Sequence, residues 1–255
     1  MEKIITQVNV SDFPSELSTF FDGATVYDSH CRSGAGVLYL DTGYFLKYDV
    51  KNSLAREAEM ADLFYKLGLG VEPVAYISRD RDYFVTRAAD GEDMTHYLND
   101  PTLVCDALAE AMVRLHSFHV GDAPISLSLK HYAEATSFDE SNYDESFLSA
   151  HFAVSSKSEA KRLMNEYKGA FATDTLIHGD FCLPNVILKG GRFGAFVDLG
   201  LAGAGDRHID VYWALWTLAY NLGTDKYADR FLDAYGKDKI DPDMLRAVAS
   251  FEAFG

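Results

Sequence analysis

The stretch "LIHGDFCLPNVILKGGRFGAFVDLG", residues 176–200, decides the expected fold because it places two carboxylates and an amide in an otherwise apolar run. Asp180 and Asp198 lie among Leu, Ile, Val and Phe, where burying an unpaired carboxylate is costly. The stretch contains three short apolar runs, the last two joined by the turn "KGGR". Asp180 is therefore expected on a loop between strands, with Asn185 soon after it and Asp198 directly after the last strand.

The spacing of His178, Asp180 and Asn185, followed by a strand-end Asp198, is typical of the catalytic loop and metal-binding aspartate of kinases. Asp180 would accept the proton of an attacking hydroxyl and hold that hydroxyl in line. Asn185 and Asp198 would supply oxygen ligands to Mg²⁺. The alternative makes the aspartates hairpin-turn residues and Asn185 a loop cap. It suits each residue alone better than all three in this order.

Composition places the chain among ordinary globular proteins. It has 255 residues, is 48% hydrophobic and 24% charged, and is long enough for one large domain or two small ones. Its formal net charge of -16 argues against nucleic acid as a partner, since phosphate backbones bind basic surfaces. Such a field attracts a cationic small molecule, but an acidic protein with no such purpose has the same composition.

Sequence features also bear on the compartment. We find no apolar run long enough for a membrane span, and the N-terminal residues lack the pattern of a signal peptide. The three cysteines, Cys31, Cys105 and Cys182, have no disulfide or zinc spacing. We therefore expect a cytoplasmic protein with no membrane partner.

The texture of the chain changes near residue 90, which predicts a two-lobed α+β fold. Residues 1–90 are expected to form a β-rich nucleotide-binding lobe, and residues 91–255 a mainly helical lobe with the catalytic loop and acceptor site, with a cleft between the lobes. The predicted elements of the first lobe are strands at 36–41 and 44–49, a helix at 53–68 capped by Ser53, and strands flanking the turn "RDRD".

The second lobe carries the longer helical patterns. A helix is predicted at 100–119, with Asp100 as its N-cap and Pro101 in its first turn. The acidic segment 137–147 has little periodicity and is expected to be a loop. Further helices are predicted at 157–171, 207–222, 224–235 and 241–253.

Lys47, in the strand "YFLKYD", is the candidate for a phosphate-gripping lysine. An inward-facing lysine needs a carboxylate partner, which Glu57 or Glu59 on the next helix could supply. The alternative is a lysine on an edge strand that faces water. The glycine-rich "CRSGAGVLYL" upstream is consistent with a loop whose backbone amides cover phosphates.

The run "HGDFCLPNVILKGGRFGAFVDLGLAGAGDRHID", residues 178–210, resembles the aminoglycoside 3'-phosphotransferase family, within a wider kinase-like set that includes choline kinases. The resemblance extends over nearly the whole chain. It implies a protein-kinase-like fold, ATP or GTP as phosphate donor, Mg²⁺, and transfer of phosphate to a sugar hydroxyl. It makes Asp180 the catalytic base, Asn185 and Asp198 the metal ligands, and Lys47 the contact to the α and β phosphates.

The resemblance also assigns supporting residues. Glu57 rather than Glu59 matches the ion-pair partner of Lys47, and Asp210 matches an aspartate that braces the catalytic loop. The implied nucleotide contacts are Ser33 in the phosphate-covering loop, the Phe45 ring on the base, and the backbone of Arg87 and Ala89 at the hinge.

For the acceptor, the resemblance suggests a cationic small molecule such as an aminoglycoside, at a 3'-type hydroxyl. Its implied contacts are Asn142, Tyr143, Asp144 and Glu145 in the loop "SNYDES", with Tyr220, Asn221 and Glu252. The alternative for that loop, equally consistent with its sequence, is an acidic segment that faces water and binds nothing. The family often has acidic residues at the places of Tyr220 and Asn221, and usually Arg at that of Leu201.

These departures keep two other functions open. One is a kinase for another hydroxylated metabolite, such as an amino alcohol or sugar. The other is a nucleotide-binding pseudokinase module, which is disfavoured because Lys47, Asp180, Asn185 and Asp198 are all present. His116 and His119 suggest a metal site, but we expect a helix cap or core packing. Trp213 and Trp216 are expected in the core or in the acceptor cleft.

Overall fold

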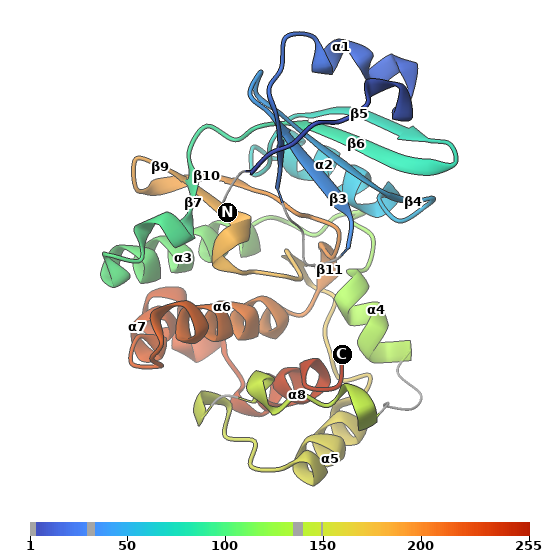
Figure 1. Cartoon of the computed structure of the whole chain (residues 1–255). Helices are drawn as coiled ribbons and strands as arrows, with labels where there is room; N and C mark the ends of the chain where they lie inside the picture. Colours follow the sequence, from blue (N-terminus) through green and yellow to red (C-terminus); the bar gives the residue numbers. More distant parts are fainter. Residues whose placement is uncertain (1–3, 30–33, 135–139, 149) are drawn as a thin grey trace. The chain divides into compact units, whose positions relative to one another are not determined.

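The computed structural model describes residues 4–29, 34–134, 140–148 and 150–255 (Figure 1). The chain divides into two compact units. The first comprises Met1–Asp90 and Ala195–Gly200, and the second comprises Gly91–Gly194 and Leu201–Gly255. The six residues 195–200 thus belong with the N-terminal unit, although they are the end of the stretch 176–200, the rest of which belongs to the second unit.

The first unit is built on a six-stranded antiparallel sheet in the order β1-β2-β3-β4-β6-β5. The strands are β1 (Ile4–Ile5), β2 (Val26–Asp28), β3 (Gly36–Leu40), β4 (Tyr44–Val50), β5 (Pro73–Ser78) and β6 (Arg81–Arg87). The predicted hairpin of β3 and β4 is confirmed, and its turn places Gly43 at a φ of 93°, which glycine adopts without steric cost.

The sheet buries one apolar face against the short helix α1 (Ser18–Phe21) and the 3-10 turn Ser15–Leu17. Period-2 alternation along the strands supplies this core. Its buried members are Leu17, Phe21, Val26, Leu38, Leu40, Leu46, Tyr83 and Val85. The sequence patterns did not predict β1, β2 or α1.

Helix α2 (Ala55–Lys66) confirms the predicted helix but begins differently. Ser53 is not its cap, because the Ser53 hydroxyl donates to the Val50 carbonyl. The cap comes instead from β6, where the buried Asp82 carboxylate accepts the Leu54 N–H at 3.0 Å. Asp82 therefore belongs to a strand and not to a turn, and a cap from a neighbouring strand leaves no local sequence signature.

The second unit is mainly helical. Its helices are α3 (Pro101–His116), α4 (Leu127–Glu134), α5 (Lys157–Tyr167), α6 (Arg207–Leu222), α7 (Ala228–Tyr235) and α8 (Pro242–Glu252). α3 packs against α6 and α7, and α8 packs against α5 and α6 (Figure 1).

Most of the predicted helices exist, with shifted ends. α6 has the predicted bounds, and Asp100 caps α3 by accepting the Leu103 N–H at 3.0 Å. The predicted helices at 100–119 and 157–171 were too long by three and four residues. α5 stops because Lys168, with a ψ of 116°, leaves the helical conformation and Gly169 has a φ of 85°. The short helix α4 was not predicted.

Three pairs of chain segments form the small sheets of the second unit. β8 (Thr175–Ile177) pairs with β11 (Gly203–Gly205), while β9 (Val186–Lys189) lies between β7 (Glu92–Asp93) and β10 (Arg192–Phe196). β8, β9 and β10 correspond to the three apolar runs of the stretch 176–200. The segment expected as a loop at 137–147 is described from residue 140 and contains the 3-10 turns Glu140–Asn142 and Glu145–Phe147.

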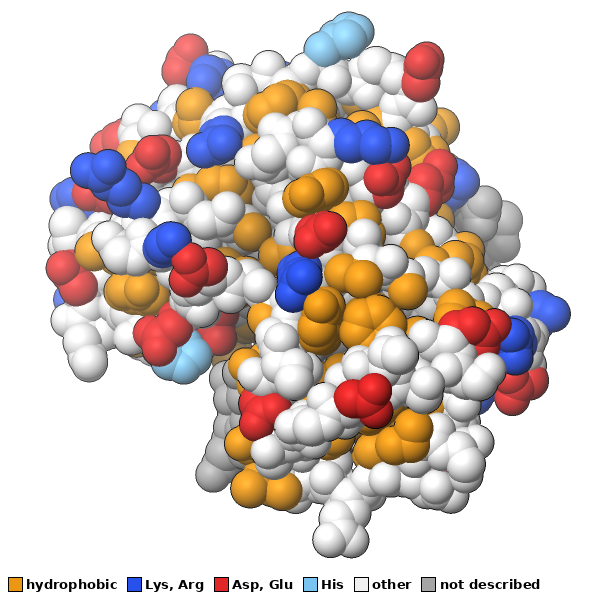
Figure 2. All heavy atoms as spheres, turned by 90° about the horizontal axis from the view of Figure 1, so that it is seen from above, with side chains coloured by type: hydrophobic (Ala, Val, Ile, Leu, Met, Phe, Trp, Pro, Cys, Tyr) orange, Lys and Arg blue, Asp and Glu red, His pale blue; other side chains and the backbone are white. Residues whose placement is uncertain are grey.

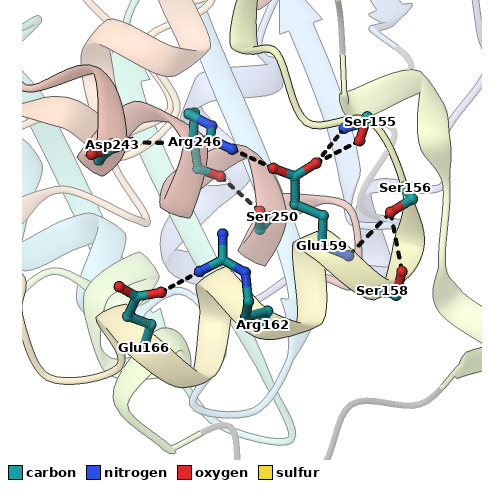
Figure 3. Close-up of polar contacts among 9 residues, drawn as sticks. All are labelled: Ser155, Ser156, Ser158, Glu159, Arg162, Glu166, Asp243, Arg246 and Ser250. Atoms are coloured by element: carbon teal, nitrogen blue, oxygen red, sulfur yellow. Dashed lines mark hydrogen bonds and ion pairs between the residues drawn. The ribbon is translucent and has the colours of Figure 1, made fainter.

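Polar contacts join α8 to α5 (Figure 3). Arg246 of α8 pairs with Glu159 of α5 and, at 3.0 Å, with Asp243. Glu159 also accepts the Ser155 hydroxyl at 2.6 Å, and the Ser156 hydroxyl caps α5 by accepting the Glu159 N–H. Because Arg246 and Glu159 are mostly shielded from solvent, this network fixes α8 against α5.

The surface is mixed in charge. Figure 2 shows Lys and Arg side chains scattered between Asp and Glu side chains on the face it presents, not gathered into one basic area of the described residues. In the part of the chain that the structure describes, no helix is long and apolar enough to cross a membrane.

Candidate functional site

Lys47 of β4 lies between two carboxylates within the first unit. Its Nζ atom is 2.8 Å from Glu57 Oε2 and 2.9 Å from Asp198 Oδ1. The Lys47 and Glu57 side chains are 15% and 11% exposed, whereas that of Asp198 is 45% exposed. Of the two candidate partners on α2, Glu57 pairs with Lys47, and Glu59 pairs with Arg56 at 2.9 Å.

The strand position of Lys47 excludes the edge-strand alternative. β4 is an inner strand, and Lys47 lies opposite Val37 of β3 and Phe84 of β6. Glu57 lies on the buried side of α2 with Met60 and Phe64, so that helix holds its carboxylate beside the sheet.

Asp198 reaches this cluster because its segment is anchored to the first unit. The Phe196 N–H donates to the Leu69 carbonyl at 2.7 Å, and the Phe196 ring contacts Phe64 edge-on at 6.2 Å. Asp198 itself has a φ of 58°, a left-handed conformation in which Asp is over-represented among non-glycine residues. The observed turn directs its carboxylate to Lys47.

Electrostatics keep this cluster charged. Burial by itself lowers the pKa of Lys47, but the carboxylates of Glu57 and Asp198 outweigh it, and the pKa lies above its ordinary value. Lys47 therefore remains an ammonium at neutral pH. Burial raises the pKa of Glu57, and the charge of Lys47 opposes that rise. A half-buried ammonium with an exposed carboxylate beside it is suited to hold phosphate oxygens.

Asp180 and Asn185 lie on the loop between β8 and β9 in the second unit. The Asn185 amide nitrogen donates to the Asp180 carbonyl at 3.0 Å and to Asp180 Oδ2 at 2.9 Å. Both hydrogen bonds use the amide nitrogen of Asn185 and leave its side-chain oxygen. An amide oxygen is the type of atom that Mg²⁺ accepts as a ligand. Asp180 is half-buried, and Asn185 is buried.

Asp210 of α6 fixes the backbone of this loop through hydrogen bonds. Its fully buried carboxylate accepts the His178 and Gly179 N–H groups, each at 2.8 Å. His116 Nε2 lies 3.1 Å from the same carboxylate, and its Nδ1 lies 2.8 Å from the Tyr235 hydroxyl. His116 is thus a core residue, as expected, and the bracing position of Asp210 is observed.

Gly179 is required where the loop passes close to other backbone. It has a φ of 83°, and a Cβ there would lie 2.6 Å from the Leu201 carbonyl oxygen. Any side chain at position 179 would clash with Leu201 and displace the backbone directly before Asp180.

The remaining nucleotide-side residues lie in the first unit, except that Ser33 falls outside the described residues. Phe45 precedes Lys47 by two positions, so both side chains share one face of β4, and its ring lies 5.0 Å from that of Tyr39. The Arg87 N–H already donates to the Glu72 carbonyl at 2.9 Å. Ala89 is half-buried just beyond β6.

Glu252, the last residue of α8, has a pKa that the charge of Asp180 influences. Burial raises the pKa of Glu252 to about 7, and the negative charge of Asp180 adds to the rise. The Tyr132 hydroxyl donates to its carboxylate and opposes the rise. Tyr132 was missed by the sequence analysis, because helix α4 is short and its pattern is weakly periodic.

The loop at 142–145 docks beside the end of α8. The Asp144 N–H donates to the Ala253 carbonyl at 2.9 Å, and the Tyr143 ring lies 5.0 Å from that of Phe254. The Asp144 carboxylate accepts the Ser146 N–H at 2.8 Å. Asn142 and Glu145 are exposed.

The two predicted contacts on α6 differ in their surroundings. Tyr220 is 60% exposed and stacks on Trp216. The Asn221 amide nitrogen donates to the Thr217 carbonyl and hydroxyl at 2.8 and 3.0 Å, so Asn221 is tied to its own helix. The Thr217 hydroxyl also accepts the Leu183 N–H at 3.3 Å, which joins α6 to the catalytic loop.

Comparisons with known proteins agree with this geometry. Residues 41–248 match the model of the phosphotransferase enzyme family (APH). The chain is 40% identical, over 98% of its length and 97% of the relative's, to a probable aminoglycoside 3'-phosphotransferase of Lactococcus lactis subsp. lactis. It is 30% identical to an aminoglycoside 3'-phosphotransferase of Niallia circulans over 68% of this chain and 67% of the other.

Solved structures show the same fold. The aminoglycoside phosphotransferase APH(3'')-Id of Streptomyces rimosus aligns with a TM-score of 0.73 at 20% identity, covering 97% of this chain and 99% of that one. An aminoglycoside-3'-phosphotransferase of type VIII aligns with a TM-score of 0.69 at 21% identity, over 96% of each chain. The expected two-lobed, kinase-like α+β fold is confirmed. This chain belongs to the phosphotransferase enzyme family, and the two relatives compared above carry the name aminoglycoside 3'-phosphotransferase, one of them as probable.

Proposed function

We propose that the chain transfers the γ-phosphate of ATP or GTP to a hydroxyl group of an aminoglycoside, at a 3'-type position. The observation that carries this proposal is the half-buried Lys47 ammonium held between Glu57 and Asp198. Curated relatives named aminoglycoside 3'-phosphotransferases support the choice of acceptor. Such a transfer alters an antibiotic, so the expected consequence in a cell is aminoglycoside resistance.

In the proposed reaction, residues 1–90 bind the nucleotide. Lys47 contacts the α and β phosphates, and Glu57 keeps its ammonium in place. The Phe45 ring stacks on the base, the backbone of Arg87 and Ala89 lies at its edge, and Ser33 belongs to the phosphate-covering loop. Site-directed exchange of Lys47 tests this half of the proposal.

Residues 91–255 would supply the catalytic loop and the acceptor site. The Asp180 carboxylate accepts the proton of the acceptor hydroxyl as its oxygen attacks the γ-phosphorus, and the bond to the leaving diphosphate breaks. Asn185 orients this carboxylate by donating to Oδ2 at 2.9 Å. Asp210 keeps the loop rigid by accepting two of its backbone N–H groups.

Mg²⁺ fits the donor chemistry of the chain. Asp198 offers a carboxylate whose side chain is 45% exposed, and Asn185 offers its side-chain oxygen, which is not used by the hydrogen bonds that its amide nitrogen donates to Asp180. When bound, the ion would neutralise negative charge on the phosphate oxygens. These two residues are the ones we propose as its protein ligands.

The acceptor side is rich in groups that favour cations. Glu252, Asp144 and Glu145, with Asn142 and Tyr143, are the proposed contacts to ammonium groups, and the net charge of -16 attracts such a molecule. Tyr220 and Asn221, the other two residues expected at the acceptor, lie in the last turn of α6. Because nucleoside triphosphates are cytoplasmic and the cysteines suit a reducing compartment, we propose action in the cytoplasm.

A second candidate is a kinase for another hydroxylated metabolite, such as an amino alcohol or sugar. It is favoured by Tyr220, Asn221 and Leu201, which stand where the resemblance implies charged residues. A phosphorylation screen separates the two. Phosphate transfer to kanamycin supports the first function, transfer only to other alcohols supports the second, and nucleotide binding without any transfer supports a pseudokinase module.

A further inference from the structure

Three aromatic rings from two separate segments form one stack in the second unit. The ring of Phe147, at the end of a 3-10 turn, lies 5.6 Å from that of Trp216 on α6, with 15° between their planes. The ring of Tyr220, one turn further along α6, lies 5.0 Å from that of Trp216, with 10° between their planes. We refer to Phe147, Trp216 and Tyr220 as the aromatic stack.

The centre of the stack is held rigidly. The indole N–H of Trp216 donates to the Ser146 carbonyl at 3.3 Å, and Trp213 contacts the Trp216 ring edge-on at 5.5 Å. Tyr220 covers Trp216 and is itself 60% exposed. A single exposed aromatic side chain is ordinary. Tyr220 differs because it ends an ordered stack, so its ring has a fixed orientation in which it can bind a ring of a ligand.

The stack lies close to the catalytic loop. Thr217, between Trp216 and Tyr220 on α6, accepts the Leu183 N–H at 3.3 Å. One helical turn is about 5.4 Å along the axis, so Tyr220 lies about one turn from the residue that joins α6 to this loop. The contact between Thr217 and Leu183 therefore places this part of α6 beside the loop that carries Asp180.

We propose that the aromatic stack binds a ring of the acceptor through the exposed face of Tyr220. This proposal rests on the proposed function. A ring with axial C–H groups and ammonium substituents suits an aromatic face, which takes apolar C–H contacts and attracts cations. Part of the acceptor is thus recognised by stacking on α6, where carboxylates would otherwise bind its ammonium groups, and Asn221, tied to Thr217, is not required for it.

The test uses the tryptophans of the stack. The chain has only two, Trp213 and Trp216, and both lie at this site. The purified full-length protein is titrated with kanamycin without nucleotide while tryptophan emission is recorded, and KM and kcat are measured for kanamycin and for ATP. The variants are Tyr220→Ala, Tyr220→Phe and the control Tyr65→Ala, which removes an exposed tyrosine from α2.

We expect kanamycin to change the emission saturably. Tyr220→Ala should weaken binding and raise the KM for kanamycin about fivefold. Its kcat, its KM for ATP and its thermal unfolding midpoint should stay at wild-type values. Tyr220→Phe should retain wild-type affinity because the ring face remains, and Tyr65→Ala should behave as wild type.

Two other outcomes have different meanings. If kanamycin is phosphorylated and Tyr220→Ala leaves both its binding and its KM unchanged, the stacking proposal is wrong and the proposed function stands. If no aminoglycoside is phosphorylated or changes the emission of the wild-type protein, the proposed function fails, and the stacking proposal fails with it.

Discussion

Lys47 and Asp198 are 151 positions apart in the chain, yet their side chains form an ion pair of 2.9 Å within the first unit. The pair exists because β4 is an inner strand of the sheet and residues 195–200 pack onto the same unit. The lysine proposed to contact the nucleotide thereby meets the proposed metal ligand.

Replacing Lys47 by Met should lower kcat/KM for the nucleotide by about 10- to 100-fold, the value of one charge-assisted hydrogen bond or more. Steady-state kinetics at varied ATP concentration measure this change. Lys51→Met, on the exposed turn after β4, is the matched control and should act as wild type. Unchanged nucleotide kinetics in Lys47→Met would remove this lysine from the phosphate site.

Asp198→Asn should abolish the Mg²⁺ dependence of nucleotide binding, since it replaces the proposed anionic ligand by a neutral amide. Isothermal titration of ATP with and without Mg²⁺ checks this directly. Wild-type protein treated with a chelator should resemble the variant. Equal Mg²⁺-dependent gains in affinity for the two proteins would show that the metal ligand lies elsewhere.

Asp180→Asn should reduce kcat by about 10²- to 10⁴-fold while nucleotide affinity stays close to wild type, because the carboxylate acts on the acceptor hydroxyl. The amide keeps the size of the side chain beside Asn185. Turnover close to wild type would exclude Asp180 as the base.

Asp210→Ala should destabilise the second unit by about 3–5 kcal/mol. It leaves the buried N–H groups of His178 and Gly179 without their acceptor and removes the partner of His116. Chemical denaturation measures the loss. The control is Asp106→Ala, which breaks an exposed pair with Arg230 and should leave the unfolding midpoint nearly unchanged. Similar midpoints for the two variants would refute the bracing role.

The affinity for a cationic acceptor should depend on pH through Glu252. The pKa of Glu252 is raised to about 7 mainly by burial, so its ionised fraction falls about tenfold from about pH 8 to about pH 6. The KM for kanamycin should rise by a similar factor over this range. In Glu252→Gln the KM should be high and nearly constant. Tyr132→Phe removes a hydrogen bond to the carboxylate, so it should move the transition to higher pH.

Glu252 also links stability to pH, in a direction that can be checked. Its folded pKa lies above the unfolded value, so the folded state binds more protons between about pH 4.5 and about pH 7. Stability from this group is therefore present at low pH and is lost as pH rises through 7. Glu252→Gln should flatten that decline in thermal unfolding experiments, and an unaltered pH profile would contradict the assignment.

Local patterns were sufficient for much of the fold. The apolar runs around Asp180 predicted β8, β9 and β10, an apolar face with an aspartate cap predicted α3, and the helix predicted at 207–222 is α6. β1, β2 and α1 were missed because elements of two to four residues contain too few positions to show a period.

Long-range contacts explain the other differences. The cap of α2 comes from Asp82 on a neighbouring strand, and Tyr132 reaches Glu252 across 120 positions. Neither contact leaves a local signature. The amide nitrogen of Asn221 donates to the Thr217 carbonyl, although the resemblance had implied that Asn221 contacts the acceptor as Tyr220 does. The structure thus adds contact partners of the proposed site residues that the sequence patterns did not predict.

The most direct test of the central claim is phosphate transfer to kanamycin. The purified protein is incubated with ATP, Mg²⁺ and kanamycin, and the product is analysed by mass spectrometry with mapping of the modified hydroxyl. We predict a singly phosphorylated product modified at the 3'-hydroxyl, and its loss in Asp180→Asn. A protein that binds Mg·ATP but phosphorylates no aminoglycoside, or an Asp180→Asn variant as active as wild type, would contradict the account.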